Sequence, residues 1–378
     1  MSKKSLISKF EVAPIRAQLV QPFRTALGEH TVLENVLFTL ELGDGTKGYG
    51  EAAVATHITG ETVMETTQNL QALGHELIDQ DSNDYLAISA HVHSRLPNNK
   101  AAVAAIETAL ADALTRQWKI PLWKFLGVNP RRPQRLVSDI TIVIAELKET
   151  EDSVKKYYAQ GFRAFKVKIG RDKDLDYKRV LAVKKIAPRC PIYLDANQGY
   201  SARQTLEFVR KLKRNGLRPA LIEQPVPKTD WEGLKEVTRL AGVPVCADES
   251  VSSLTDAVRA VSEKAVNVIN IKLMKTGLFQ AREIALLARA QGIDLMIGGM
   301  METSLAMTTS AHLAAGLGGF KYIDLDTPFF IKEGRQRDNP YLSRRGVYDL
   351  SKVKAGIGIV PQANTIKPAC RQAGSDIW

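Results

Sequence analysis

Eight short, β-rich runs recur between residues 137 and 325, and a segment long enough for a helix separates each run from the next. Regular alternation of strand and helix favours an α/β fold with a parallel sheet, and eight strands favour a (β/α)₈-type barrel over an open sheet. The spacing of the runs is that of one strand–helix unit in such a barrel. The predicted strands are 137–143, 164–169, 191–195, 220–223, 244–248, 267–272, 294–298 and 321–325.

The chain before these runs follows a different pattern and predicts a small α+β domain. Residues 10–20 and 33–42 alternate between apolar and polar side chains, as antiparallel strands do. Gly43-Asp44-Gly45 follows the second of these runs and is a strong hairpin signal. Helices are predicted over 61–80, 84–96 and 100–117.

Three regions follow from these patterns. Asn129-Pro130-Arg131-Arg132-Pro133 is a natural linker. We therefore expect an α+β domain over residues 1–130 and a barrel over residues 131–339. Residues 340–378 are mostly polar and are expected to pack back on the first domain.

Charge and cysteine content limit the classes of partner. The formal net charge is +11, but basic and acidic residues are mixed within helix-like segments, and aromatic residues do not interleave with them. A nucleic-acid-binding role is therefore not expected. The three cysteines form no CxxC pair, and the chain has neither a leader-like apolar core nor a membrane-length apolar run. We expect a cytoplasmic protein that does not contact membranes and forms a homo-oligomer.

Polar residues occupy the C-terminal ends of most predicted strands, which is where barrel active sites lie. In Phe165–Gly170, Lys166 and Lys168 are two residues apart, so both side chains point to the same face of the strand. A single pair of this kind usually indicates a solvated strand face, but the pattern repeats from strand to strand. The series is Thr141, Lys166, Lys168, Asp195, Asn197, Glu223, Asp248, Glu249, Asn270, Lys272, Asp324 and Asp326.

Three carboxylates follow three successive strands, namely Asp195, Glu223 and Asp248. Carboxylates that converge in one site repel one another unless a cation lies between them. Hard oxygen ligands favour Mg²⁺, which keeps further positions for water and substrate. The alternative is that each carboxylate pairs separately with a neighbouring lysine.

Two lysines are expected to face each other across this site, because Lys168 lies on the second predicted strand and Lys272 on the sixth of eight. Such a pair suits removal of a proton from one face of a carbon and its return to the other. The ammonium of Lys166 and a nearby metal would depress the pKa of a lysine base towards neutrality. A proton α to a carboxylate is weakly acidic, so the metal must stabilise the enediolate that forms.

Five segments resemble the enolase superfamily, specifically its muconate lactonizing subgroup. They are KVKIG (166–170), LDANQGY (194–200), IEQP (222–225), ADES (247–250) and INIK (269–272). The resemblance covers essentially the whole chain and implies a modified TIM barrel of the (β/α)₇β type, with the first domain as a capping domain. It also implies three Mg²⁺ ligands, an acid/base pair, a lysine that holds the substrate carboxylate and an asparagine that supports the metal site. Asp195, Glu223 and Asp248 would be the Mg²⁺ ligands, and Lys168 and Lys272 the acid/base pair. Lys166 would hold the substrate carboxylate, and Asn197 would support the metal site.

The eighth strand resembles that of dipeptide epimerases, in which two aspartates hold the α-ammonium of the substrate. Asp324 and Asp326 match that pair, and two carboxylates away from the metal need a cation, which a free amino terminus would supply. The alternative is that a lysine or backbone amides satisfy the pair. By the same resemblance, Thr141, Gly299 and Met301 would contact the substrate.

The identity of the dipeptide is less well defined. The segment 22–27 resembles a cap loop of L-Ala-D/L-Glu epimerases, and Arg24 could meet a γ-carboxylate there. However, a basic residue at this position also occurs in relatives that prefer apolar dipeptides. The resemblance thus implies a Mg²⁺-dependent epimerase that inverts the C-terminal residue of a dipeptide such as L-Ala-L-Glu or another L,L-dipeptide.

Two other functions stay open. The same fold and metal site would serve an o-succinylbenzoate synthase, an N-succinylamino acid racemase or a muconate cycloisomerase, none of which needs an ammonium site. A barrel without catalytic activity that binds an anionic partner through its basic surface is the other alternative. Its binding would weaken steeply with salt and would not depend on Mg²⁺.

Overall fold

A computed structural model describes residues 3–127, 135–332 and 339–361. The chain begins with a three-stranded antiparallel sheet in the order β1-β2-β3. These strands are Ile7–Arg24, Glu29–Leu42 and Lys47–Ala52, preceded by the 3₁₀ turn η1 (Lys3–Ser5). Glu41 pairs with Lys47, which confirms the hairpin predicted at Gly43–Gly45.

Helices cover this sheet, and three of them match the predicted segments. The three matching helices are α2 (Val63–Leu77), α3 (Tyr85–Arg95) and α4 (Lys100–Gln117). The same region also contains α1 (Thr56–Thr59), η2 (Ser82–Asp84) and α5 (Leu122–Leu126). The alanine-rich helix α4 packs closely on β3, because a Cβ atom at Gly50 would lie 1.9 Å from the backbone oxygen of Ala105. Glycine in the strand and alanine in the helix therefore fix this contact.

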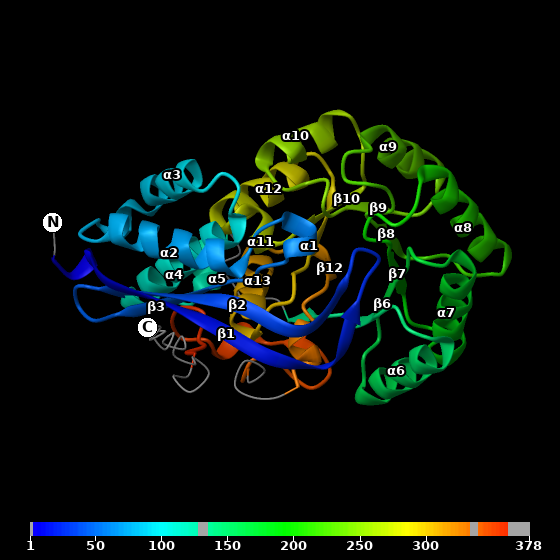
Figure 1. The fold of residues 1–378 in the computed structure, drawn as a ribbon, viewed down its shortest axis with the longest axis horizontal. Helices are drawn as coiled ribbons and strands as arrows, with labels where there is room; N and C mark the ends of the chain where they lie inside the picture. Colours follow the sequence, from blue (N-terminus) through cyan, green and yellow to red (C-terminus); the bar gives the residue numbers. More distant parts are fainter. Residues whose placement is uncertain (1–2, 128–134, 333–338, 362–378) are drawn as a thin grey trace, which may run out of the picture.

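The second region is a curled parallel sheet of eight strands with helices on its outer side (Figure 1). All eight predicted strands are confirmed. The strands are β5 (Ile140–Ile142), β6 (Phe165–Lys168), β7 (Ile192–Asp195), β8 (Leu221–Glu223), β9 (Val245–Ala247), β10 (Val268–Ile271), β11 (Asp294–Ile297) and β12 (Phe320–Ile323). The helices are α6 (Leu147–Gln160), α7 (Lys173–Ile186), α8 (Ala202–Arg214), α9 (Trp231–Leu240), α10 (Leu254–Ser262), α11 (Leu273–Thr276), α12 (Leu278–Ala290) and α13 (Ser304–Leu317).

The two ends of the sheet meet where β12 approaches the residues before β5, and we call this place the seam. There the backbone N–H of Asp139 donates to the carbonyl of Ile323 at 2.8 Å, and the N–H of Leu325 donates to Ser138 Oγ at 2.8 Å. In the described part of the chain, β12 is followed by the 3₁₀ turn η3 (Thr327–Phe330) rather than by an eighth outer helix. This architecture confirms the (β/α)₇β expectation.

The C-terminal segment contacts both regions. β13 (Val347–Tyr348) pairs with β4 (Leu136–Val137), and η4 (Leu350–Lys352) follows. Asp112 of α4 accepts a hydrogen bond from the N–H of Ile357 at 2.7 Å, and Arg116 donates to the carbonyl of Ile359 at 2.8 Å. The linker predicted at residues 129–133 lies outside the described residues.

Figure 1 also shows how the first domain meets the barrel: the β1–β2 hairpin extends towards β6 and β7, beside the short helix α1. None of the described helices is long and apolar enough to cross a membrane.

Candidate active site

A cavity lies between the barrel mouth and the end of the β1–β2 hairpin. Phe23, His30 and Ile58 line it from the first domain. From the barrel, both predicted catalytic lysines, Lys168 and Lys272, line the same cavity. It also brings together most of the predicted substrate-binding residues, namely Thr141, Lys166, Asn197, Gly299, Met301, Asp324 and Asp326.

The three predicted metal ligands, Asp195, Glu223 and Asp248, are buried beneath this cavity. Asp195 and Glu223 are neighbours in the parallel ladder, and Asp248 follows the next strand, β9. Each lies close to a lysine: Lys166 Nζ is 2.9 Å from Asp195 and 2.7 Å from Glu223. We call these three the lysine-paired carboxylates.

The charges of these buried groups control one another. Burial alone would raise the pKa of Asp195, but Lys166 and Lys168 lower it to about 2. Burial and the charge of Asp195 raise the pKa of Glu223 to about 7. Glu223 accepts a hydrogen bond from Asn270 Nδ2 at 2.7 Å through one oxygen only. Among the described residues, its Oε2 has a nearby cation but no hydrogen bond.

The donor set fits Mg²⁺, because three buried carboxylates from adjacent strands offer hard oxygen ligands. The second oxygen of Glu223 makes no hydrogen bond among the described residues and lies 2.7 Å from the Lys166 ammonium, so it is an oxygen that a metal ion could also take as a ligand. In this structure lysine ammonium groups balance the carboxylate charge. From the sequence, pairing of each carboxylate with a lysine was the alternative to a metal site. The structure shows this pairing, in a set of carboxylates that also fits Mg²⁺.

Of the two candidate catalytic lysines, Lys168 ends β6 and Lys272 directly follows β10, and these strands lie four apart in the sheet order. Lys168 Nζ donates to Asp195 at 2.6 Å and to Asn197 Oδ1 at 3.0 Å. Lys272 Nζ donates to Asp248 at 2.6 Å. Asn197 has a φ of 39°, a left-handed conformation that asparagine tolerates better than most residues, and this turn directs it towards Lys168.

One electrostatic expectation differs from the structure. A depressed pKa was expected for a lysine base, and burial alone would lower the pKa of Lys272, but Asp248 and Glu223 raise it instead. Lys166 behaves in the same way, since nearby carboxylates outweigh its burial and raise its pKa well above the usual value. The expectation included a metal beside the lysines, whereas here the carboxylates interact with the lysines directly.

A second group of buried carboxylates lies at the seam and comprises Asp139, Asp324 and Asp326. One oxygen from each lies within 4.8 Å of the others, and we call them the seam carboxylates. Lys166 Nζ donates to Asp324 at 2.6 Å, and the N–H of Thr141 donates to Asp326 at 2.5 Å. A lysine and a backbone amide thus partly satisfy the aspartate pair, while both aspartates still line the cavity.

Arg24 lies within the described part of the chain but does not line the cavity. Its Nε donates to Glu29 at 2.8 Å, so the guanidinium is held at the end of the β1–β2 hairpin. The predicted contact between Arg24 and a γ-carboxylate has no support in the cavity lining and stays a prediction.

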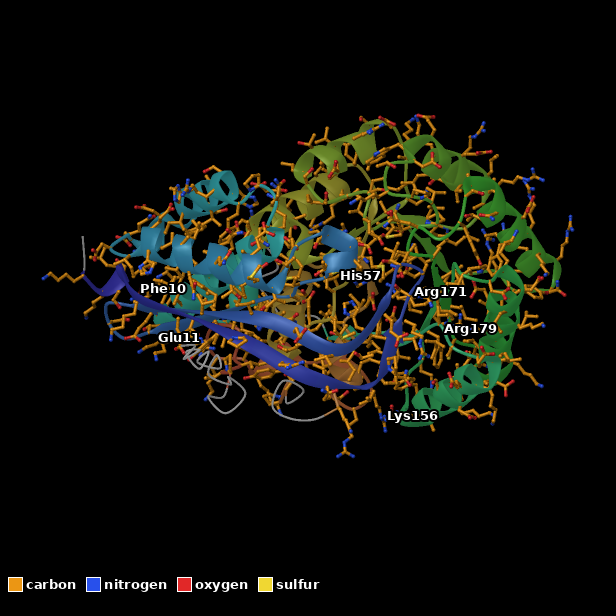
Figure 2. The ribbon with its side chains drawn as sticks, viewed as in Figure 1. Phe10, Glu11, His57, Lys156, Arg171 and Arg179 are labelled. Atoms are coloured by element: carbon orange, nitrogen blue, oxygen red, sulfur yellow. The ribbon has the colours of Figure 1, made fainter. Side chains whose placement is uncertain are left out.

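Two histidines shape the wall formed by the first domain. The rings of His30 and His57 lie 4.5 Å apart, and a Cβ atom at Gly28 would come within 3.2 Å of His57. Burial and then the charge of His57 lower the pKa of His30 to about 4, so His30 is neutral at pH 7. Figure 2 shows His57 where α1 meets the barrel. Neither histidine was assigned a role from the sequence.

Sequence reasoning also missed Asp139 and Lys275. Asp139 precedes Thr141 by two positions on the same strand face, so the spacing that revealed the other pairs could have revealed it. Lys275 lies three residues after Lys272 on the short helix α11 and reaches Asp248 at 2.8 Å. Lys272 reaches the other oxygen of the same carboxylate, so the two lysines together pair with both oxygens of Asp248.

A buried polar network connects the first domain to the loop after β11, which lines the cavity. Asn35 donates to Glu51 at 2.6 Å and to the carbonyl of Met301 at 2.9 Å. Glu51 accepts hydrogen bonds from the N–H of Thr303, at 3.0 Å, and from its hydroxyl. The cavity wall at residues 299–301 is therefore positioned from both domains.

The barrel with buried lysines and carboxylates at its mouth, closed by an α+β domain, defines a protein of the enolase superfamily. Residues 9–127 match the family model described as "Mandelate racemase / muconate lactonizing enzyme, N-terminal domain", and residues 149–365 match "Enolase C-terminal domain-like". The chain belongs to the mandelate racemase/muconate lactonizing enzyme family.

Several relatives within this family are named dipeptide epimerases. A "Hydrophobic dipeptide epimerase" from Citrifermentans bemidjiense is 49% identical, over 92% of this chain and 96% of the relative. An "Aromatic dipeptide epimerase" from Herpetosiphon aurantiacus is 39% identical, over 86% of this chain and 91% of the relative. An "L-Ala-D/L-Glu epimerase" from Bacillus subtilis is 33% identical, over 86% and 89%.

Solved structures agree with the fold. A mandelate racemase/muconate lactonizing protein from Herpetosiphon aurantiacus superposes with a TM-score of 0.89 at 37% identity, covering 94% of this chain and 99% of the other. A dipeptide epimerase from Enterococcus faecalis V583, complexed with Mg and the dipeptide L-Leu-L-Tyr, superposes with a TM-score of 0.88 at 29% identity, covering 93% and 99%.

Proposed function

We propose that this protein is a Mg²⁺-dependent dipeptide epimerase that inverts the α-carbon of the C-terminal residue. The observation that carries the proposal is the placement of Lys168 and Lys272, which come from strands four apart and line one cavity. Dipeptide epimerases among the relatives, one of them solved with Mg and a dipeptide, support the same reaction.

The proposed ligands of the ion are Asp195, Glu223 and Asp248. When bound, Mg²⁺ supplies positive charge that makes the proton α to the substrate carboxylate more acidic. Lys166 contributes a further ammonium that can hold the substrate carboxylate.

The two lysines then exchange the proton. One amine removes the α-proton from one face of the carbon, and the ammonium of the other lysine returns a proton to the opposite face. Their roles reverse with the configuration of the substrate. Asn197 holds Lys168 in place through its side-chain oxygen at 3.0 Å.

The other end of the substrate is proposed to lie against Asp324 and Asp326, which would bind the α-ammonium. Thr141 reinforces this end through the hydrogen bond from its N–H to Asp326. Gly299 and Met301 would border the substrate through the loop braced by Asn35.

We propose an apolar side chain for the C-terminal residue. Phe23, Ile58 and Met300 line the cavity, and the neighbouring His30 is uncharged at pH 7. Arg24 is paired with Glu29 rather than directed into the cavity. The names of the hydrophobic and aromatic dipeptide epimerases among the relatives agree with this preference.

A library of L,L-dipeptides in heavy water tests the function. We expect deuterium at the C-terminal α-carbon together with formation of the L,D product, fastest for apolar C-terminal residues and absent after chelation of Mg²⁺. Exchange only with acidic C-terminal residues would contradict the side-chain preference. Turnover of succinylated substrates or o-succinylbenzoate precursors, with no dipeptide exchange, would overturn the epimerase assignment.

The proposals for location and assembly rest on buried thiols and on exposed apolar side chains. The free thiols of Cys190 and Cys246 are buried, which suits a reducing cytoplasm. Exposed Leu86 and Trp118 suit a contact between copies in a homo-oligomer. Cell fractionation and light scattering check the two proposals, and a salt-dependent DNA shift assay checks the expected lack of nucleic-acid binding.

A further inference from the structure

Asp139 lies at the seam, directly behind the aspartate pair that faces the cavity. Its side chain is buried, with 1% of the residue exposed. Among the described residues, Asp324 and Asp326 line the cavity and Asp139 does not. Its backbone N–H closes the barrel by donating to Ile323, so the carboxyl group has little freedom to move away from its neighbours.

The three seam carboxylates differ in their hydrogen bonds. Asp324 accepts from Lys166, and Asp326 accepts from the N–H of Thr141. Among the described residues, neither oxygen of Asp139 accepts a hydrogen bond from any donor. A buried carboxylate without a donor is very costly, whereas a protonated carboxyl can itself donate to a neighbouring carboxylate.

Among the described residues, the cations near the seam cannot balance three negative charges. Lys166 is the cation that acts on all three seam carboxylates, but it also lies within 2.9 Å of Asp195 and 2.7 Å of Glu223. The other titratable groups that interact with the seam carboxylates or lie beside them, namely Tyr193, Glu302 and Tyr348, add no positive charge. Three carboxylates with oxygens within 4.8 Å of one another therefore cannot all stay ionised.

We propose that Asp139 is a positioning residue. Its carboxyl group stays protonated, and its O–H donates a hydrogen bond to Asp324. The seam carboxylates then carry two negative charges instead of three. As a role in substrate binding, the proposal rests on the proposed epimerase function, but the protonation of Asp139 does not. Burial and then the charge of Asp324 raise the pKa of Asp139 well above the usual value, in agreement with the geometry.

The consequence concerns the ammonium site. With Asp139 neutral, two carboxylates face one substrate ammonium and a shared Lys166, so the charges nearly balance. The hydrogen bond from Asp139 also holds Asp324 in the orientation that points into the cavity. An ionised Asp139 would leave an excess negative charge buried behind the pair.

Three substitutions test this role in the Mg²⁺-loaded protein, with an apolar dipeptide as substrate. Asp139→Asn keeps a donor and should keep kcat/KM within about threefold of the original, because the lost interaction is small. Asp139→Leu removes the donor and should raise KM about tenfold or more with a smaller change in kcat. Asp326→Asn makes the same chemical change at another seam carboxylate, one that lines the cavity, and should raise KM by about tenfold or more. Asp139→Asn as damaging as Asp326→Asn would overturn the proposal.

A second measurement does not need a substrate. Infrared difference spectra between the original protein and Asp139→Asn at pH 7 should show the loss of the carbonyl band of a protonated carboxylic acid. Asp294→Asn, an exposed aspartate paired with Lys321, is the matched control and should lose no such band. If the band is unchanged in Asp139→Asn, the proton is not on Asp139 and the proposal fails, whatever the protein catalyses.

Calorimetric titration with Mg²⁺ addresses the remaining alternative, in which the seam carboxylates bind a metal ion themselves. We expect one Mg²⁺ per chain in both the original protein and Asp139→Asn. Two ions in the original protein and one in the variant would show that Asp139 is an ionised ligand, which would overturn the proposal.

Discussion

The barrel mouth holds two groups of three buried carboxylates, and they solve the same electrostatic problem differently. The lysine-paired carboxylates each have an ammonium group within 2.9 Å. The seam carboxylates share Lys166 with that first group and otherwise depend on Thr141 and on the proposed proton of Asp139. Carboxylate groups at one barrel mouth are thus suited to different cations.

The difference agrees with the charge of the ligand that we propose for each group. Three ionised carboxylates attract a divalent cation, which can compete with lysine for the carboxylate oxygens. Two ionised carboxylates and one neutral carboxyl suit a single ammonium. The first three predictions below distinguish the two groups, and the last concerns Arg24.

The largest effect is expected from Lys168 and Lys272, which pair with carboxylates of the first group. Lys272→Ala or Lys168→Ala should reduce epimerisation by about 10²–10⁴-fold or more, because each removes a proton carrier. The remaining lysine should still exchange the α-proton of one epimer with heavy water, which proton NMR detects. Lys321→Ala is the matched control, since Lys321 also lies 2.6 Å from an aspartate but at an exposed site. Normal turnover in either active-site variant would exclude a two-base reaction.

Metal binding should distinguish the two groups next. Mg²⁺ at about 100 times its Kd should raise the free energy of unfolding by about 2.7 kcal/mol, measured by denaturant titration. Glu223→Gln should lose this stabilisation together with activity, while Asp326→Asn should keep it. Glu236→Gln, at an exposed position, controls for the substitution itself. Loss of the stabilisation in Asp326→Asn instead would place the metal at the seam.

The seam should respond to the amino group of the substrate. Asp324→Asn should raise KM for a free dipeptide by about 10–150-fold, the range for a lost hydrogen bond to a charged group. For the N-acetylated form of the same dipeptide, the variant and the original protein should differ little, because no ammonium is present. Equal losses for both substrates would mean that Asp324 acts elsewhere, for example through Lys166.

The smallest effect is expected for Arg24, which belongs to neither group. Its pair with Glu29 is partly exposed, and such pairs contribute about 0–1 kcal/mol. Arg24→Met should therefore change kcat/KM for apolar dipeptides by less than about threefold. A selective loss of more than tenfold for dipeptides with C-terminal glutamate would restore the predicted contact with a γ-carboxylate.

The strands and most of the candidate site could be predicted from the sequence, because both depend on short-range periodicity. Residues two apart share a strand face, and this rule alone placed Lys166 with Lys168 and Asp324 with Asp326. The active-site lysines then followed from the order of the strands.

What could not be predicted depends on long-range side-chain packing. The hydrogen bond between Thr141 and Asp326 joins positions 185 residues apart, and the crowding around Asp139 arises only where the two ends of the sheet meet. Whether the pKa of Lys272 is raised or lowered depends on which carboxylates lie close to its ammonium group. The local pattern of a strand contains neither piece of information.

The network around Glu51 has a consequence for synthesis of the chain on the ribosome. Glu51 belongs to the third strand to emerge, yet Thr303, which donates to it, is 252 positions further along. Chains emerge from the N-terminus at a limited rate, so the nascent first domain holds a carboxylate whose set of hydrogen bonds can be completed only after the seventh barrel strand has been translated. The first domain is synthesised first, but its packing can be completed only near the end of translation.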